Sequence, residues 1–587
     1  MPAEDQELRR INWTETFGFV QLFRTFRLAI NPWKMLFALA LLLSVYAAGR
    51  IIDGIWLAGG GGAHHGEVVA YANTGGDWSA LCQQLDEARQ STLAGMLMTT
   101  GIEPDAAKAQ TMAEQTPGEA VDKIHDKIRK DYLDARTAWK DDQDNAEMLE
   151  AVRSARAVYL DNRRLLDTVE RHGPFITLLQ YENWYVRQAI EAVRYGQFSG
   201  GLNELMKMRR GELAGSDAQV GLPGRMPFPG MAEVHGEGGL GFLACLAYMA
   251  LGVKWMLCAH WLFAIVFLLV GLALASLFGG ALCRMAALDA ARDEKLGLRE
   301  AWRFACGKFL SFATAPLIPL AGIVLTAVFM FLGGLLAGIP VVDVIAGVIW
   351  PLALIGGLVI AMLAVGLAGG GSLMFPTIAV EGSDSFDALS RSYSYLFARP
   401  WRTGFYALVA LIYGTFCYLF VRFFVYVLLK ATHLAVGLGM FRDRPAAGEG
   451  VEKLDAIWAS PTFESLMPDW SLLSVAHGTD WLAGVLIGVW VAIAASLVCA
   501  FLISFYFNGC TIAYLLLRRE VDATDMDDVY VEEPEEPETP SSETPEQPAG
   551  ESAPPEPGDE GEAPASEPSE AAPPPDKPDE GAGEPPQ

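Results

Sequence analysis

Long apolar stretches alternate with shorter amphipathic stretches along most of this chain. A helix needs about 20 apolar residues to cross the hydrocarbon core of a membrane. Six stretches are long enough: 34–57, 256–282, 311–338, 344–372, 404–430 and 481–516. The pattern therefore predicts an all-α polytopic membrane protein with six transmembrane helices. Another apolar run, 239–253, is separated from the second span by Lys254 and is interpreted as an interfacial lead-in.

Amphipathic segments precede three of these spans, at residues 1–33, 283–310 and 381–403. Apolar residues recur there at helical spacing, with basic residues off the apolar stripe. Two entries into spans are alike, Asn31-Pro32-Trp33-Lys34 and Arg399-Pro400-Trp401-Arg402. We interpret this as three tandem helical hairpins, each preceded by a basic interfacial helix. Amphipathic connections occur in any polytopic protein, so a genuine threefold repeat and independent connections both stay open.

The basic residues of the short connections predict the orientation. Arginines and lysines gather before the first span, in 283–310, in 381–403 and at Arg518-Arg519, whereas the 339–343 turn has none. Cytoplasmic loops carry the excess of positive charge. With six spans, both termini are cytoplasmic and the loops 58–255 and 431–480 face outward. We expect an integral protein of the bacterial cytoplasmic (cell inner) membrane.

The charge of the chain is concentrated at its C-terminal end. The sequence is 52% hydrophobic yet has a formal net charge of −27. The last 56 residues hold 18 acidic residues, one lysine and 16 of the 33 prolines. We predict that residues 522–587 form a disordered, low-complexity acidic tail. The acidity therefore belongs to this tail and does not describe a broad acidic surface on the rest of the protein. We expect no nucleic-acid partner.

The loop 58–255 contains the only sizeable insert between spans. Helical spacing predicts helices over 77–99, over Pro117–Arg171 with a break near Asp141–Asn145, and over 175–198 after Gly173-Pro174. Together they predict a helical bundle with an antiparallel hairpin. Glycine-rich stretches at Gly59–Gly62 and Gly221–Gly241 are interpreted as flexible tethers.

Residues that could carry chemistry are sparse. Eight scattered cysteines form no CxxC motif, although Cys82 and Cys245 could pair across the insert. His64-His65 beside Glu67 suggests a metal pair, but adjacent residues do not share a helix face. The sequence thus predicts no catalytic residue, cofactor or metal, and no enzyme. Within the spans Arg422 is the deepest charge, and Asp343 is its candidate partner in a structural pair; a substrate or ion site is the alternative.

A resemblance is carried by Gly370-Gly371, the run Leu373–Glu381 and the run Phe386–Tyr393. Over about 240–520 the chain resembles the six-span membrane domain found with some bacterial glycerophosphodiester phosphodiesterases and related uncharacterised families. There, a span ends on glycine, and an acidic residue and an Ala-Leu-x-x-Ser helix lead to the next span. The resemblance implies an architecture but no activity, because no catalytic domain accompanies it. The insert lies outside the family pattern.

Two functional hypotheses follow. The first is a non-enzymatic envelope scaffold or interaction protein whose extracytoplasmic insert engages a protein partner, while the spans contact the lipid bilayer. The alternative is a transporter or lipid-handling permease component, which tandem hairpins and Arg422 would suit. The substrate or partner, the oligomeric state and the role of the tail cannot be read from these residues.

Overall fold

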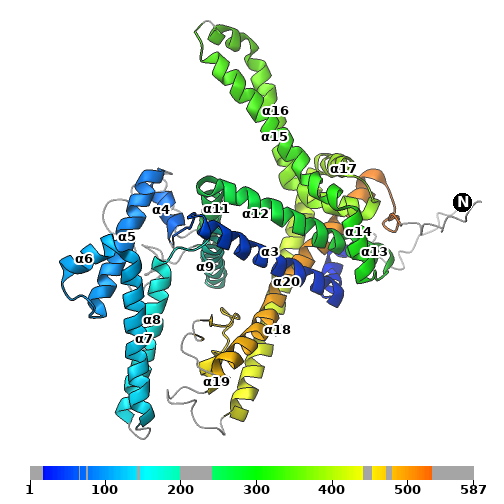
Figure 1. Ribbon diagram of the computed structural model, residues 1–587. Helices are drawn as coiled ribbons and strands as arrows, with labels where there is room; N and C mark the ends of the chain where they lie inside the picture. The colour runs from blue at the N-terminus through cyan, green and yellow to red at the C-terminus, as the bar shows by residue number, and fades with distance from the viewer. Residues whose placement is uncertain are drawn as a thin grey trace, which may run out of the picture. The chain divides into compact units, whose positions relative to one another are not determined.

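The computed structural model describes residues 18–64, 66–74, 77–141, 146–198, 241–340, 342–440, 453–470, 473 and 479–531 (Figure 1). Within these residues the chain is helical, and its one isolated β-bridge joins Ala63 to His172. The early helices are η1 (Gly18–Arg24), α2 (Thr25–Ala29), α3 (Pro32–Ala58), α4 (Glu67–Asn73), α5 (Trp78–Thr99), α6 (Ala106–Gln115), α7 (Pro117–Asp141), α8 (Ala146–Val169) and α9 (Pro174–Arg194). The later helices are α11 (Phe242–Ala259), α12 (Trp261–Leu274), η2 (Ala275–Gly279), α13 (Gly280–Arg292), α14 (Leu298–Gly307), α15 (Phe309–Ala337), α16 (Val342–Glu381), α17 (Ser385–Ala398), α18 (Pro400–Met440), α19 (Lys453–Ile457) and α20 (Thr479–Asp522).

Seven helices among the described residues are long and apolar enough to cross a membrane. Six correspond to the predicted spans: α3, the continuous unit α12–η2–α13, α15, α16, α18 and α20. The seventh is α11, which lies on the run interpreted as a lead-in. Lys254 does not interrupt this helix, because a single lysine has good helix propensity and can extend its ammonium group away from apolar neighbours. The structure thus confirms an all-helical protein with several membrane-length helices.

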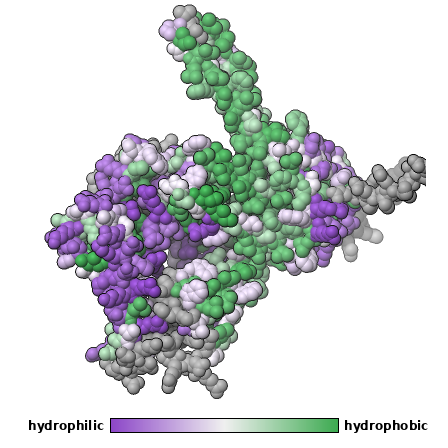
Figure 2. All heavy atoms as spheres, in the orientation of Figure 1, coloured by the Kyte–Doolittle hydropathy of each residue, from purple (hydrophilic) through white to green (hydrophobic). Residues whose placement is uncertain are grey.

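Helix α20 lies beside three other membrane-length helices, α3, α16 and α18. Helix α3 also lies beside α12, and α15 lies beside α16. A short loop connects α15 to α16. Residues 441–478, which include α19, connect α18 to α20. In α15 and α16 the most apolar stretch has no buried residue, and Figure 2 shows apolar surface along both helices. Such an exposed apolar surface is typical of helices that face lipid.

We call one packed region the basic hub: η1, α2, α13, α14, α17, the adjoining ends of α16, α18 and α20, and residues 523–530. Leu28, Leu288, Tyr395, Tyr514 and Val529 belong to a single buried cluster that joins all of these elements except α14, which packs on α13. The helices predicted in 283–310 and 381–403 are confirmed as α14 and α17. In the first amphipathic segment, residues 1–17 lie outside the described part, and the described residues start with a 3₁₀ helix, η1, that leads into α2.

The insert contains the predicted helices. Helices α7 and α8 flank residues 142–145 and pack against each other, as the predicted break requires. With α5 and α6 they enclose a core that includes Leu97, Ile124, Tyr132 and Leu166, and their outer surface is hydrophilic (Figure 2).

The other part of the insert, α4 and α9, packs directly on the membrane-length helices. A second core joins Val68, Tyr185, Tyr248, Trp255 and Phe263, which come from α4, α9, α11 and α12. Helix α9 begins where the Asp53 carboxylate of α3 accepts the N–H groups of Phe175 and Ile176, at 2.9 and 3.0 Å. The insert is therefore fastened to α3 by a buried helix cap.

Two further expectations are corrected, and a third falls on residues outside the described part of the chain. Gly59–Gly62 is packed and hydrogen-bonded rather than a tether, because Gly59, Gly60 and Gly61 donate to carbonyls of the last turn of α3. The expected tether at Gly221–Gly241 lies outside the described residues except for Gly241. The structure also shows Cys82 and Cys245 as free thiols, one exposed and one buried.

The predicted tail begins later than residue 522. Residues 523–530 pack on the hub, where the Tyr530 N–H donates to the Val380 carbonyl at 2.8 Å. Arg284, itself 5% exposed, donates to the carbonyls of Ala379 and Tyr530, both at 2.8 Å. The sequence of residues 523–530 has no hydrophobic periodicity that would predict this packing, so the composition assigned the segment to the tail. Residues 532–587 lie outside the described part of the chain.

Candidate functional site

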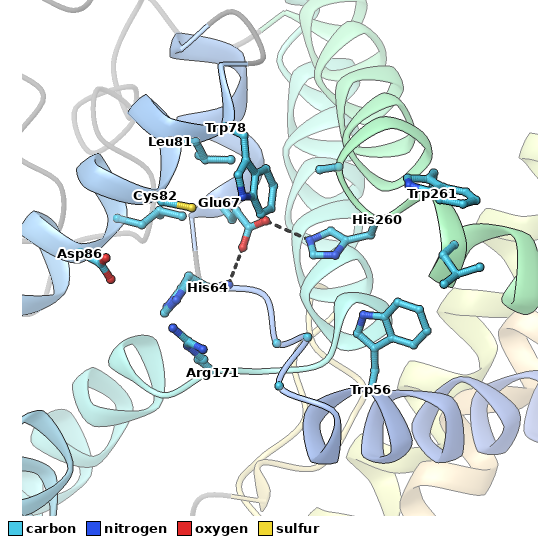
Figure 3. Close-up of a pocket in the computed structure, with 16 residues that line it drawn as sticks. Trp56, His64, Glu67, Trp78, Leu81, Cys82, Asp86, Arg171, His260 and Trp261 are labelled. Atoms are coloured by element: carbon cyan, nitrogen blue, oxygen red, sulfur yellow. Dashed lines mark hydrogen bonds and ion pairs between the residues drawn. The ribbon is translucent and has the colours of Figure 1, made fainter.

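The insert and the membrane-length helices enclose a pocket of about 350 Å³, shown in Figure 3. We call it the Glu67 pocket. Its wall combines the end of α3 and the following glycine loop, the starts of α4 and α5, Arg171, and the junction of α11 with α12. Three tryptophans line it, Trp56, Trp78 and Trp261. Trp78 and Trp261 are 52% and 59% exposed, so their rings can accept a ligand.

Glu67 is a buried carboxylate at the base of this pocket, 3% exposed. Its Oε1 accepts from Trp255 Nε1 at 3.2 Å and lies 2.9 Å from His260 Nε2, while its Oε2 accepts the His64 N–H at 2.8 Å. Burial raises the pKa of Glu67, but the hydrogen bonds from His260, the His64 backbone and Trp255 outweigh it. The pKa therefore lies below its ordinary value of 4.5, and Glu67 is ionised at neutral pH.

Local sequence explains how Glu67 is positioned. Gly66 has a φ of +81°, a conformation that favours glycine, and α4 begins at the next residue. On the other wall, α11 ends at Ala259 and α12 begins at Trp261, so the imidazole of His260 is presented at the break between them. A Cβ at Gly61 would lie 2.6 Å from the Trp56 ring, so only glycine lets the loop approach that closely.

The rim of the pocket carries two charges of opposite sign, Asp86 and Arg171. Both side chains are exposed, and neither forms an ion pair with another described residue. His64 lies between them in Figure 3. Burial, followed by the charge of Arg171, lowers the pKa of His64, so its imidazole is neutral at pH 7. The pocket thus offers one cation and one anion that are free to meet a ligand.

One thiol, that of Cys82, belongs to the pocket wall. Burial, followed by the charges of Asp86 and Glu67, raises its pKa. A thiol with a raised pKa is a poor nucleophile at neutral pH. Glu67 already receives three donors, which makes it a structural anchor for the pocket. Among the described residues no group of three or more side chains could hold a metal ion.

A second polar centre lies at the hub. Lys34 of α3 is 2% exposed, and its Nζ lies 2.7 Å from Asp289 Oδ2 of α13 and 3.0 Å from Asn508 Oδ1 of α20. Asn508 in turn donates to the Ser504 carbonyl at 2.7 Å, and the Ser504 hydroxyl donates to the Ala29 carbonyl at 2.9 Å. A buried lysine and carboxylate joined in this way hold three membrane-length helices together.

The structure does not bring together the predicted pair Arg422 and Asp343. The Arg422 guanidinium donates to the carbonyls of Phe463, at 2.9 and 3.1 Å, and Glu464, at 3.1 Å, and to the Tyr418 hydroxyl at 2.6 Å. Asp343 is exposed in the first turn of α16, where its carboxylate accepts the Val344 N–H at 2.8 Å. Arg422 thus fastens the 453–470 loop to α18, because a loop carbonyl can satisfy an arginine as well as a carboxylate can.

Sequence reasoning missed the residues that the structure groups. Glu67 drew notice only beside His64-His65, and His260 and Asp53, which lie near the ends of predicted spans, were assigned no role. His65 is outside the described residues. One available signal was the group Trp255, His260 and Trp261 at a single span entrance, because polar-tipped aromatic residues there need hydrogen-bond partners. The signal for Lys34 was its place in the repeated Pro-Trp-basic entry.

The fold defines the class of this chain as a polytopic helical membrane protein with a packed helical insert. No protein-family model matches it, and no curated protein or solved structure matches it. The resemblance to the membrane domain of bacterial glycerophosphodiester phosphodiesterases stays a prediction.

Proposed function

We propose that this chain is a non-enzymatic ligand-binding protein of the bacterial cytoplasmic membrane that acts through its extracytoplasmic insert. The observation that carries the proposal is the Glu67 pocket. It lies where α4, α5 and Arg171 of the insert meet α3, α11 and α12. A pocket with aromatic walls and a few placed polar groups is typical of small-molecule sites.

The contacts of α11 support a topology in which six helices cross the membrane and both termini lie on the side of the basic connections. Helix α11 is antiparallel to α9, because Phe242 N–H donates to the Gln197 carbonyl and Gly252 packs on Glu182. One end of this α9–α11 hairpin lies at Asp53 and Glu67, beside the outer end of α3.

The other end of the hairpin also faces the outer side. Arg194, at the end of α9, pairs with Glu464 of the 453–470 loop at 3.5 Å. Arg187 and Arg194 are exposed on α9, and an arginine at the centre of a bilayer costs about 3 kcal/mol by insertion scales. We therefore place α9 and α11 along the outer surface of the membrane, so α11 does not cross it.

Mass spectrometry of the intact, full-length protein from mild detergent tests the ligand-binding proposal. We expect a non-covalent small-molecule adduct on the wild type that Trp78→Ala removes. Trp401→Ala is the matched control, because Trp401 is 90% exposed on α18 and outside the pocket. An adduct that survives Trp78→Ala contradicts the proposal. A stoichiometric protein partner, with no small-molecule adduct, would instead favour a scaffold.

The Lys34–Asp289 pair favours one second candidate, a transporter. Ionisable residues between membrane helices are common in proton and ion pathways. Proteoliposomes with an internal pH-sensitive dye test this idea under an imposed ion gradient. An ion flux that is present with the wild type and abolished by Asp289→Asn supports transport. If proteoliposomes with the wild type show no more flux than protein-free liposomes, the transporter hypothesis is wrong.

A further inference from the structure

We propose that the Glu67 pocket binds the headgroup of a zwitterionic phospholipid, a phosphodiester joined to an ammonium group. This inference rests on the proposed ligand-binding function and names its ligand class. The phosphate would lie against Arg171, and the ammonium group against Asp86 and the face of Trp78. The acyl chains would leave the pocket along α12.

The level of the pocket in the membrane supports a lipid. Trp56 is in the last turn of α3, and Trp261 is the first residue of α12. Tryptophans at the ends of spans mark the level of the lipid headgroups. The pocket therefore opens at the depth where phospholipid headgroups lie.

One wall of the pocket continues into the lipid-facing surface. Trp261 and Leu262 line the pocket, and both are also exposed, at 59% and 48%. Ile265 is one turn further along α12 and is 48% exposed, followed by Leu268 and Leu269. An acyl chain attached to a headgroup in the pocket would thus find an uninterrupted apolar path down α12. A soluble zwitterion would make no use of this path, so the membrane is the favoured source.

The charges select a dipolar headgroup. Glu67 is already saturated by His64, Trp255 and His260, so it shapes the pocket without adding a free charge. Arg171 and Asp86 are the two charged side chains of the wall without an ion-pair partner among the described residues. Arginine suits phosphate oxygens through its planar fork, and an ammonium group is stabilised by a carboxylate and by a tryptophan face.

Lipid titration of the delipidated full chain, followed by mass spectrometry of the intact complex, tests the assignment. The probes are short-chain phosphatidylethanolamine, short-chain phosphatidylglycerol and free phosphoethanolamine. We expect phosphatidylethanolamine to bind about tenfold more tightly than phosphatidylglycerol, the effect of one charge-assisted hydrogen bond. Free phosphoethanolamine should compete only weakly, because it lacks the chains that follow α12.

Two variants separate the two ends of the headgroup. Arg171→Ala should weaken both lipids by about tenfold, whereas Asp86→Asn should remove the preference for phosphatidylethanolamine and leave phosphatidylglycerol unchanged. Arg129→Ala and Asp122→Asn are matched controls, since both residues are exposed on α7 away from the pocket. Neither control should change either affinity.

Three outcomes would overturn the assignment. Equal affinity for the two lipids would contradict the proposed contact with the ammonium group. Unchanged lipid binding in Arg171→Ala would contradict the proposed contact with the phosphate. Competition by free phosphoethanolamine at the concentration of the lipid identifies a soluble ligand instead. The ligand-binding proposal itself is judged separately, since an adduct of other chemistry that is lost in Trp78→Ala would uphold it while the lipid assignment fails.

Discussion

Breaking the Lys34–Asp289 pair should destabilise the hub more than any surface change. In Lys34→Met the Asp289 carboxylate, which is 11% exposed, loses the ammonium group 2.7 Å away and cannot move to water. Removing one partner of a buried ion pair typically costs about 3–5 kcal/mol, because the other charge stays buried and unpaired. Asn508, which loses the same donor at 3.0 Å, adds to the effect.

The double variant Lys34→Met/Asp289→Leu should recover most of this stability. Replacing both charges by apolar side chains of similar volume removes the desolvation cost together with the attraction, and such replacements are often neutral. Lys295→Met is the matched control, because Lys295 is exposed in the loop between α13 and α14.

Thermal unfolding of the purified protein in one detergent, followed by reaction of the free cysteines with a fluorogenic thiol dye, measures these changes. We expect Lys34→Met to lower the Tm by about 5 °C or more, the double variant to lie near the wild type, and Lys295→Met to match it. A Lys34→Met protein as stable as the wild type would refute the reasoning. A double variant no more stable than the single one would show that Asn508 and packing dominate.

Three other changes test further parts of the structure. Because the pKa of Glu67 in the folded protein lies below 4.5, the carboxylate stabilises the fold fully above that pH, and this contribution is lost as the pH falls through the folded-state pKa. Glu67→Gln should therefore lower the Tm at pH 7, whereas in acid the Tm of the variant and that of the wild type should converge. Burial raises the pKa of Glu182 to about 7, so the carboxylate destabilises the fold as the pH rises from 4.5 through 7. The shift corresponds to roughly 3 kcal/mol, which solvent screening of this half-buried group reduces to about 2 kcal/mol. Glu182→Gln should gain that amount at pH 8 and nothing at pH 4, and equal gains at both would contradict the burial argument. A chain ending at Ala523 leaves Arg284 without the Tyr530 carbonyl and should lose about 1.5–3 kcal/mol, whereas a chain ending at Val531 should unfold like the full chain.

The insert shows how far helical periodicity reaches. The break near Asp141–Asn145 and the stop at Gly173-Pro174 were readable, because apolar spacing and a proline at the first helical turn are local signals. What α9 packs against was not readable. Its apolar face meets α11 and its first turn meets Asp53, and both contacts depend on residues far away in the chain.

The charged residues show the limit of the same reasoning. Arg422 was found as a deep charge, but the partner inferred for it was a carboxylate, whereas the structure supplies loop carbonyls. Every residue has a carbonyl, so no residue type marks such a partner in advance. Lys34 was noticed at the entry into the first span, yet its contact with Asn508 joins positions 474 residues apart.

The sequence by itself determined that this is an all-helical chain with membrane-length apolar helices, three short connections rich in basic residues, and a helical insert with its hairpin. These properties follow from local composition and from the 3.6-residue period, which each segment carries alone. Only the tertiary structure decided that His260 and Trp255 meet the carboxylate of Glu67, that Lys34 meets Asp289, and that residues 523–530 pack against α13 and α16. A hydrogen bond or ion pair acts over about 3 Å and between residues of any sequence separation, so these groupings exist only once the helices have packed.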